Sequence, residues 1–233
     1  MLTLPGALSP PIVPNVAGGA IATRVRVDLH LHSSASFDCR VPPLEVARRC
    51  GQLGLSPIFL TDHEGIDGAR SLIEAGEPAV IGQEILTNEG ELIGLFLKKL
   101  VSSQLSAEET VAAIKDQGGL VYLEHPYDSG RRNLREDAIE RIAGQIDIVE
   151  VFNGRSQPEI NRRAEELRAT LGVPAGAGSD AHTLAEIGSV FVEMEAFDGA
   201  YDFLAKLRDG KVVIRRPGWK SAAQRLFVNR RRY

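Results

Sequence analysis

The sequence predicts an α/β fold in which mostly parallel strands are wrapped by helices, closing as a barrel rather than a sandwich. Two observations indicate this class. Short apolar and β-branched runs alternate with helical patterns along most of the 233 residues, and such alternation is typical of parallel strands joined by helices. All five histidines directly follow apolar runs, and α/β barrels and open sheets place their sites at the carboxyl ends of strands. We therefore expect one site at that end of the strands.

The first half of the chain carries clear local signals for its elements. A β-branched run leads into the first histidine motif, and alternate side chains of Val25–Leu31 share a face. Pro42 and Pro43 open a helix whose apolar positions recur at helical spacing until Gly54. Turn-forming residues at 88–90, between two apolar runs, predict a hairpin. Further strands are expected at 57–61, 79–86 and 92–97, and a further helix at 65–75.

The second half continues the alternation. Ser106 and Glu109 form a capping-box pattern at the start of the next helix. Gly176, Gly178 and Gly188 are expected to allow close packing, because no strand-to-helix GxGxxG context surrounds them. The remaining strands are expected at 120–123, 147–152, 174–177, 189–194 and 211–214, and the remaining helices at 134–143, 158–171 and 201–207.

A single domain is expected over residues 24–233, because no linker interrupts the alternation and 233 residues suffice for a large α/β core. Residues 1–23 contain four prolines and no charged side chain, and we interpret them as an extended arm. The formal net charge is −4, yet residues 206–233 carry ten Lys or Arg against one acid. This basic tail is interpreted either as a solvated helix face or as a nucleic-acid contact.

The chain is expected to be cytoplasmic. Cys39 and Cys50 cannot build a disulfide framework and lack the spacing of zinc fingers. The N-terminal segment lacks the basic region and continuous apolar core of a signal peptide, and no window reaches the ~18 apolar residues of a membrane span. We therefore expect no membrane partner, and nothing in the sequence indicates an obligate protein partner.

The placement of the histidines predicts a polynuclear metal site. The stretch VDLHLHSSASFD, residues 27–38, puts His30 and His32 on one strand face, with Asp28 ahead of them and Asp38 behind. Neutral imidazole is the commonest metal ligand, and a nearby carboxylate can orient a ring through its other nitrogen. The other histidines follow strands in the same way: His63 in FLTDH, His125 in LVYLEHP and His182 in AGAGSDAH.

The motifs DLHLHSSASFD, LTDH, GQE, EHP and GSDAH, in this order within residues 27–182, resemble those of the PHP (polymerase and histidinol phosphatase) family of metal-dependent phosphoesterases. The resemblance implies a distorted seven-stranded (β/α) barrel with up to three divalent metals at the carboxyl ends of its strands. Imidazole and carboxylate donors without thiolate suit Zn, Mn or Fe, so about two to three such ions are expected as cofactors.

The resemblance also implies a set of nine ligands, of which Glu84 bridges two ions. Family members often have a histidine on the strand after the bridging glutamate, where this sequence offers Glu91. Asp28 and Asp62 are expected to orient the ligands rather than to bind metal. The allocation is His30, His32, Glu84 and Asp180 on the first ion, Glu84, Glu91 and His125 on the second, and Asp38, His63 and His182 on the third.

Phosphoryl transfer also needs cations on the phosphoryl oxygens, where charge spreads in the transition state. Arg131 and Arg132 follow the HP motif and Arg155 follows EVFNG, so these arginines are candidates for binding phosphate. The alternative is that they form surface salt bridges. Glu150 and Asn153 are either ligands or buried hydrogen-bonding groups. The catalytic set is expected to comprise Glu84, His125, Asp180 and Arg155.

The function expected from these residues is hydrolysis of a phosphate ester by a metal-bridging hydroxide. The substrate would be a phosphomonoester or a nucleotide. One alternative is a 3′-5′ exonuclease or oligonucleotide phosphatase that holds a short oligonucleotide with the basic tail, which strong salt dependence would indicate. Another is a non-catalytic metal-binding module that regulates a partner, and a third is C–N hydrolysis.

Overall fold

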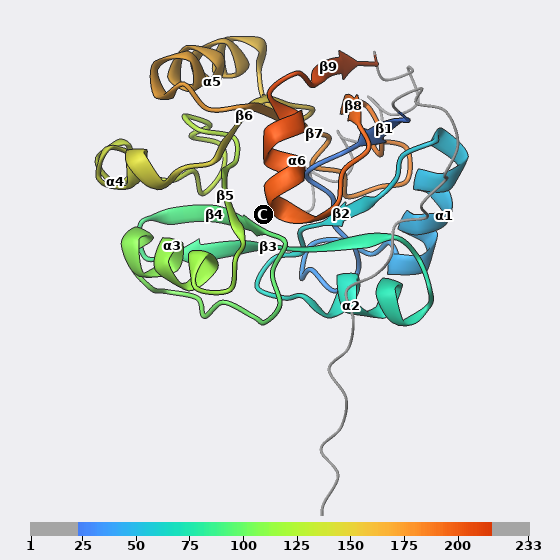
Figure 1. The fold of residues 1–233 in the computed structure, drawn as a ribbon. Helices are drawn as coiled ribbons and strands as arrows, with labels where there is room; N and C mark the ends of the chain where they lie inside the picture. Colours follow the sequence, from blue (N-terminus) through green and yellow to red (C-terminus); the bar gives the residue numbers. More distant parts are fainter. Residues whose placement is uncertain (1–22, 216–233) are drawn as a thin grey trace, which may run out of the picture.

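A curled sheet of six strands forms the centre of the fold in the computed structural model, which describes residues 23–215 (Figure 1). Neighbouring strands are parallel except for β4, which is antiparallel to the strands on both sides. Residues 1–22 of the expected arm (residues 1–23) and the basic tail beyond residue 215 lie outside the described residues. In sheet order the strands are β2 (Ile58–Leu60), β3 (Ala79–Thr87), β4 (Gly90–Leu95), β5 (Leu120–Leu123), β6 (Ile148–Asn153) and β7 (Ala175–Gly178).

A smaller antiparallel sheet packs beside the curled one. Its strands lie in the order β1 (Arg24–Val27), β8 (Val190–Glu195) and β9 (Lys211–Ile214). The α/β class is confirmed, and so is the hairpin, because Thr87 of β3 pairs with Gly90 of β4. Among the described residues the curled sheet has six strands rather than the seven expected.

The chain after β1 runs between the two edges of the curled sheet. Leu29 donates its backbone N–H to the carbonyl of Ala177 at 3.2 Å, beside β7. Two residues later, the carbonyl of Leu31 accepts from the N–H of Thr61 at 2.9 Å, beside β2. The backbone thus changes partners after Val27, and no continuous ladder can form. For this reason the regular strand ends at Val27, whereas the sequence predicts that it continues to Leu31.

The predicted helices are all present, with ends that follow local chemistry. Pro43 occupies the first turn of α1, and Gly54 ends it with a left-handed φ of 68°. Ser106 and Glu109 form the expected capping box at the start of α3. The helices are α1 (Pro43–Leu53), α2 (Asp67–Glu74), α3 (Ala107–Lys115), α4 (Glu136–Ile142), α5 (Pro158–Leu171) and α6 (Gly199–Leu207), with a 3₁₀ turn η1 at Ala143–Gln145.

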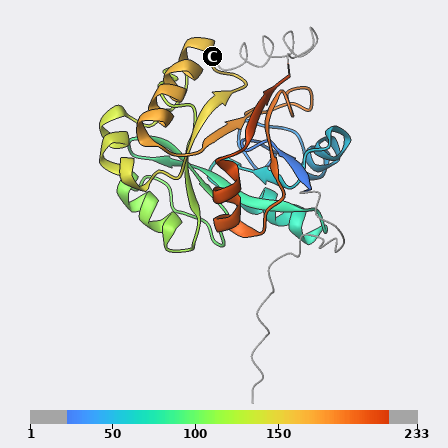
Figure 2. The ribbon, with the colours of Figure 1, turned by 45° about the horizontal axis from the view of Figure 1, so that its top comes forward.

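Both faces of the curled sheet are covered, so its strands are apolar on both sides. On β4, Leu92 belongs to the cluster packed under α3 and α4, whereas the next residue, Ile93, belongs to a cluster shared with β1, β8 and α6. Figure 2 shows α3, α4 and α5 along one side of the sheet. In the second cluster the rings of Phe59 and Phe203 lie 5.1 Å apart, joining β2 to α6.

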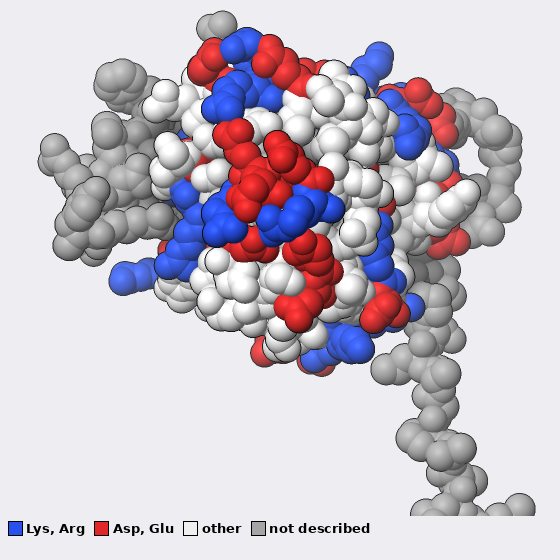
Figure 3. Space-filling model, turned by 90° about the vertical axis from the view of Figure 1, so that its left-hand side faces the viewer, with Lys and Arg blue, Asp and Glu red and all other residues white. Residues whose placement is uncertain are grey.

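The outer surface of α3, α4 and α5 is charged, with acidic and basic side chains interleaved (Figure 3). Arg141 on α4 reaches Glu108 on α3 at 2.6 Å and Asp137 at 2.9 Å. These side chains are 40–58% exposed, so each pair contributes little to stability. The buried apolar faces of these helices hold them in place instead. No helix within residues 23–215 has the length and apolar character needed to cross a membrane.

Close packing at Gly178 provides a test of this fold. A Cβ at Gly178 would overlap the Cβ of His30 and lie 2.8 Å from the backbone nitrogen of His30. We expect Gly178→Ala to lower the free energy of unfolding by about 1–3 kcal/mol, the usual cost of overpacking. Urea denaturation measures the change.

Gly51→Ala is the matched control. Gly51 lies inside α1, and a methyl group at this position would meet no atom within 4 Å. Alanine in a helix interior is favoured over glycine by roughly 0.5–1 kcal/mol, so we expect this variant to be slightly more stable than the parent. Equal stability of Gly178→Ala and the parent would contradict the packing described here.

Candidate metal centre

The five histidines of the chain meet at one place, although they come from four separate segments. The ring of His32 lies 5.1 Å from that of His30, 4.7 Å from that of His63 and 4.4 Å from that of His182. The ring of His125 lies 5.7 Å from that of His30. Four of them are nearly inaccessible to solvent, and His63 is partly buried. The imidazoles that follow these strands therefore lie together in one cluster.

Glu84 on β3 lies at the centre of this cluster. Its Oε2 is 3.2 Å from Nε2 of His30 and 3.2 Å from Nε2 of His32. Its Oε1 is 3.1 Å from Nε2 of His125, and Nδ1 of His63 is 3.4 Å from Oε2. The two oxygens of Glu84 thus face different imidazoles, which is the arrangement expected of a carboxylate that bridges two cations.

The structure brings together the four residues expected to hold the first ion. Besides the contacts with Glu84, Oδ1 of Asp180 is 3.4 Å from Nε2 of His32 and 4.0 Å from Nε2 of His30. Donors bound tetrahedrally at about 2.0–2.1 Å from a zinc ion stand roughly 3.3 Å from one another. The separations between these donor atoms are close to that value, so the group has the size of a metal site.

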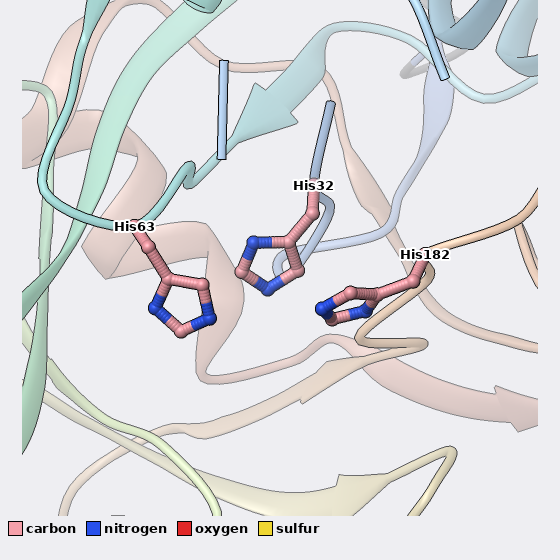
Figure 4. A group of neighbouring side chains, drawn as sticks. All are labelled: His32, His63 and His182. Carbon is pink, nitrogen blue, oxygen red and sulfur yellow. The ribbon is translucent and has the colours of Figure 1, made fainter. Parts of the chain in front are cut away.

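The residues expected to hold the third ion also lie together. Oδ2 of Asp38 is 3.0 Å from Nε2 of His182 and 3.7 Å from Nε2 of His63. Figure 4 shows His63 and His182 on either side of His32, and the three imidazoles can share one ion. His32 therefore lies between the first and third groups.

The expected second group is arranged differently. Oε1 of Glu91 is 3.7 Å from Nδ1 of His63, and Glu91 forms a potential site with His63 and Glu84. His125 instead forms one with Glu84 and Glu124 and another with His30 and Asp180. Glu124 is fully buried, and the sequence interpretation assigned it no role although it stands in the EHP motif. Its proximity to Glu84 is set by the end of β5, which the motif alone does not describe.

The atoms of His32 show how the site favours a cation. Nδ1 lies 3.2 Å from the hydroxyl of Ser36, whereas Nε2 is buried and makes no hydrogen bond of acceptable geometry to the described residues. Burial, together with the neighbouring His182, lowers the pKa of His32 well below its usual range. His32 is thus a neutral imidazole with a lone pair directed into the cluster, as a metal ligand must be.

The charges of the cluster depend on one another. Burial acts to lower the pKa of His30, but the carboxylates of Glu150 and Glu84 outweigh it and raise that pKa to about 10. Burial and the charge of Glu84 raise the pKa of Glu91 to about 8. A positive charge among these carboxylates is therefore strongly favoured, whether a proton on His30 or a bound cation carries it.

Glu150 orients His30. The carboxylate of Glu150 is fully buried on β6, with Oε1 3.1 Å from Nδ1 of His30 and 3.0 Å from the hydroxyl of Tyr122. Its Oε2 accepts from the backbone N–H of His125 at 2.8 Å. With Nδ1 of His30 held in this way, Nε2 points at Glu84. The sequence left open whether Glu150 is a ligand, and its contacts place it behind the ring of His30, on the side away from Glu84.

The two aspartates expected to orient ligands act through hydroxyl and backbone groups. Asp62 accepts from the Ser36 hydroxyl at 2.9 Å, and Ser36 in turn contacts His32. Asp28 accepts from the backbone N–H of Ser179 at 2.8 Å and of Gly188 at 3.1 Å, and so fixes the segment that carries Asp180.

Two of the residues at the site have a left-handed backbone. His125 has φ 28° and Asp180 has φ 50°, a region that costs side-chain-bearing residues about 1–3 kcal/mol. Hydrogen bonds hold both: Glu150 accepts from the N–H of His125, and the carbonyl of His30 accepts from the N–H of Asp180 at 2.8 Å. Such strain persists where surrounding structure determines the position of a functional group.

A cleft of about 830 Å³ opens onto the cluster, and all three candidate arginines line it. Arg131 is paired with Asp180 and lies 3.4 Å from Asp128. Nη1 of Arg155 is 2.5 Å from Nδ1 of His182 and 3.6 Å from Oδ1 of Asp180. Arg132 is exposed and forms no ion pair within residues 23–215. The cleft therefore contains two arginines that contact His182 or Asp180 and one exposed arginine, Arg132, whose charge acts to lower the pKa of Glu91.

The sequence matches one family model and is similar to curated proteins. A family model described as PHP-associated matches residues 158–212, which include Asp180 and His182. The chain is 32% identical over 177 residues to the uncharacterized protein MJ0417 of Methanocaldococcus jannaschii, covering 72% of this chain and 70% of that protein.

Solved structures share the fold at low sequence identity. A two-domain protein from Bacteroides vulgatus that contains a predicted PHP-like metal-dependent phosphoesterase matches with a TM-score of 0.64 and 18% identity, over 83% of this chain and 65% of that one. The lesion-specific endonuclease PfuEndoQ from Pyrococcus furiosus matches with a TM-score of 0.61 and 17% identity, over 82% of this chain and 58% of that one. These likenesses establish the fold.

The three groups of donors give a stoichiometry that can be measured. We expect elemental analysis of protein purified without chelator to find about two to three transition metals per chain. His63→Ala should remove about one of them, because His63 contributes to the group with Asp38 and His182. One metal or none per chain in the metal-reconstituted parent would contradict the assignment of three metal-binding groups.

Glu150→Gln tests the role of the buried carboxylate behind His30. An amide oxygen accepts a hydrogen bond from the ring N–H of His30 more weakly than a carboxylate and raises the basicity of the ring less, so we expect metal affinity to fall by about 10- to 100-fold, as for other groups that orient metal ligands. Competition with a chelator measures the affinity. Glu74→Gln, at an exposed position on α2, is the control and should bind metal like the parent.

Proposed function

This chain belongs to the PHP (polymerase and histidinol phosphatase) family, and we propose that it is a metal-dependent hydrolase of phosphate esters. The observation that supports this proposal most strongly is the convergence of His30, His32, Glu84 and Asp180, whose donor atoms stand 3.2–4.0 Å apart. Arginines lie next to this group in an open cleft. Metal ions and guanidinium groups together are what phosphoryl transfer requires.

The residues at the site fit divalent cations by two criteria. Buried carboxylates are costly without cations, and the acids that surround the histidines are nearly inaccessible to solvent: Glu84, Glu91, Glu124, Glu150 and Asp180. The donor set also lacks thiolate, because burial raises the pKa of Cys39 to about 11 and its Sγ contacts the carbonyl of His182. Nitrogen and oxygen donors of this kind suit Zn, Mn or Fe.

When bound, ions at these groups would supply an activated water and would neutralise charge on the phosphoryl oxygens. The protein supplies the positions. Glu150 and Ser36 fix the imidazoles of His30 and His32, so that their Nε2 atoms face the cluster. We assign Arg155 to holding His182 and Asp180, and Arg132 to binding the phosphoryl group from the open side of the cleft. All five histidines belong to the cluster, so we assign protonation of the leaving group to solvent rather than to an imidazole.

Hydrolysis of an oligonucleotide is the second candidate, and the charge of the chain terminus favours it. Residues 206–233 carry ten Lys or Arg against one acid, although the residues beyond 215 lie outside the described part. If this tail holds nucleic acid, kcat/KM for an oligonucleotide should fall steeply with salt, whereas that for a small phosphomonoester should not.

A substrate screen tests the proposal directly. Mn-loaded parent protein should hydrolyse phosphomonoesters faster than phosphodiesters or amides, and His125→Ala and Asp180→Ala should each lose at least ~100-fold in turnover, the scale of electrostatic and metal contributions. Circular dichroism should show that both variants fold. Faster turnover of amides would point to C–N hydrolysis, and no turnover of any substrate would favour a non-catalytic module.

The metal content of two variants distinguishes the proposed role of Arg132 from that of Arg155. Arg132→Ala should lower kcat/KM by roughly 10- to 100-fold, the scale of one or two lost charge-assisted hydrogen bonds, with metal content unchanged. Arg155→Lys keeps the charge but loses the planar fork, and we expect it to lower both turnover and metal occupancy because Arg155 contacts His182. Unchanged kinetics of Arg132→Ala on every ester would assign Arg132 to the surface.

A further inference from the structure

Phe37 stands out among the side chains that line the cleft. It is 74% exposed, and every other lining side chain is charged or polar, glycine aside. A single exposed apolar residue is ordinary on a protein surface. This one differs because it stands at the mouth of the candidate active site, next to Asp38 in sequence and beside the ring of His63, with ring centroids 5.0 Å apart.

The loop that carries Phe37 is held in place on both sides. The N–H of Ser34 donates to the carbonyl of Val41 at 2.7 Å, which closes the loop at its base. Ser36 donates its hydroxyl to buried Asp62, and Asp38 contacts His182 at 3.0 Å. The backbone on either side of Phe37 is thus fixed. Little conformational entropy of the loop would therefore be lost when a ligand packs against the ring.

The cleft is larger than a phosphate group needs. Its volume of about 830 Å³ is within the range of pockets that hold whole small molecules. The arginines and the metal-ligating candidates account for the recognition of a phosphoryl group, and none of them is an apolar residue that would favour an apolar remainder of the substrate. Among the side chains that line the cleft, Phe37 does so. One face of its ring is turned to His63, and its high exposure leaves surface for a second ring.

We propose that Phe37 is a specificity-determining residue that stacks on a flat aromatic ring in the leaving group of the substrate, and that this ring is a nucleobase. The inference rests on the proposed function, because the phosphoryl group at the metal cluster fixes where the rest of the substrate lies. Stacking on an aromatic side chain accepts any base, since every base has a π face. The preference expected is therefore for nucleotides over sugar phosphates, without strong selection among bases.

The test compares two substrates that differ only in the base. For Mn-loaded parent protein, kcat/KM for adenosine 5′-monophosphate should exceed that for ribose 5-phosphate, and Phe37→Leu should lower only the former, by about tenfold, the scale of one lost stack. Phe37→Trp should retain the preference. Tyr201→Leu is the matched control, because Tyr201 is 90% exposed but does not line the cleft. Metal content should be the same in all variants.

A binding measurement separates this inference from the proposed function. Adenosine carries the base and no phosphate, and calorimetry should show that it binds the parent about tenfold more tightly than it binds Phe37→Leu. If phenyl phosphate shows the loss in turnover and adenosine 5′-monophosphate does not, the stacked ring is a simple aryl group and the nucleobase assignment is wrong. If both esters are hydrolysed and Phe37→Leu changes neither, the inference is wrong and the phosphoesterase proposal stands. Phe37-dependent adenosine binding without hydrolysis of any ester would overturn the proposed reaction instead.

Discussion

The burial of charge around Glu84 is the constraint on which the rest of the structure depends. Its carboxylate is 2% exposed, with four imidazoles within 3.4 Å, and such a group is costly in the interior unless positive charge and hydrogen bonds compensate it. The four imidazoles come from three segments that lie far apart in the sequence and that the curled sheet brings together. Folding and site formation are therefore coupled, and cations that bind only the folded chain would stabilise it by mass action.

Close packing around this cluster restricts the backbone conformation of the residues next to it. The segment that carries His30 passes so near β7 that Gly178 has no room for a side chain, and the chain must turn sharply at Asp180 to direct a carboxylate back at His32. The left-handed backbone of Asp180 accompanies this turn, and His125 has a left-handed backbone as well. Glu150 links the two places, because it contacts both the ring of His30 and the backbone of His125.

Local signals in the sequence predicted the features that depend on residues close together in the chain. The proline at the start of α1, Gly54 at its end and the capping box of α3 each act within a few residues, and the histidine motifs identified most of the cluster. What the sequence did not reveal depends on distant partners. The early end of β1 reflects a change of hydrogen-bonding partner from β8 to the edges of the curled sheet. The proximity of Glu91 to His63, and that of Glu124 to Glu84, likewise depend on the register between β3, β4 and β5, which no local pattern encodes.

The donors and the walls of the cleft are positioned by different parts of the chain. Strand ends fix the imidazoles and carboxylates, so the same cluster can persist while the loops around it vary. The loop at 33–41 contributes Phe37 and the loop at 126–133 contributes Arg132, and neither side chain is buried in the core. Under the proposed function, the reaction class would depend on the residues at the strand ends, and the choice of leaving group would depend on these two loops. Similarity of fold to a phosphoesterase or an endonuclease consequently cannot identify the substrate, and the side chains facing the open cleft must do so.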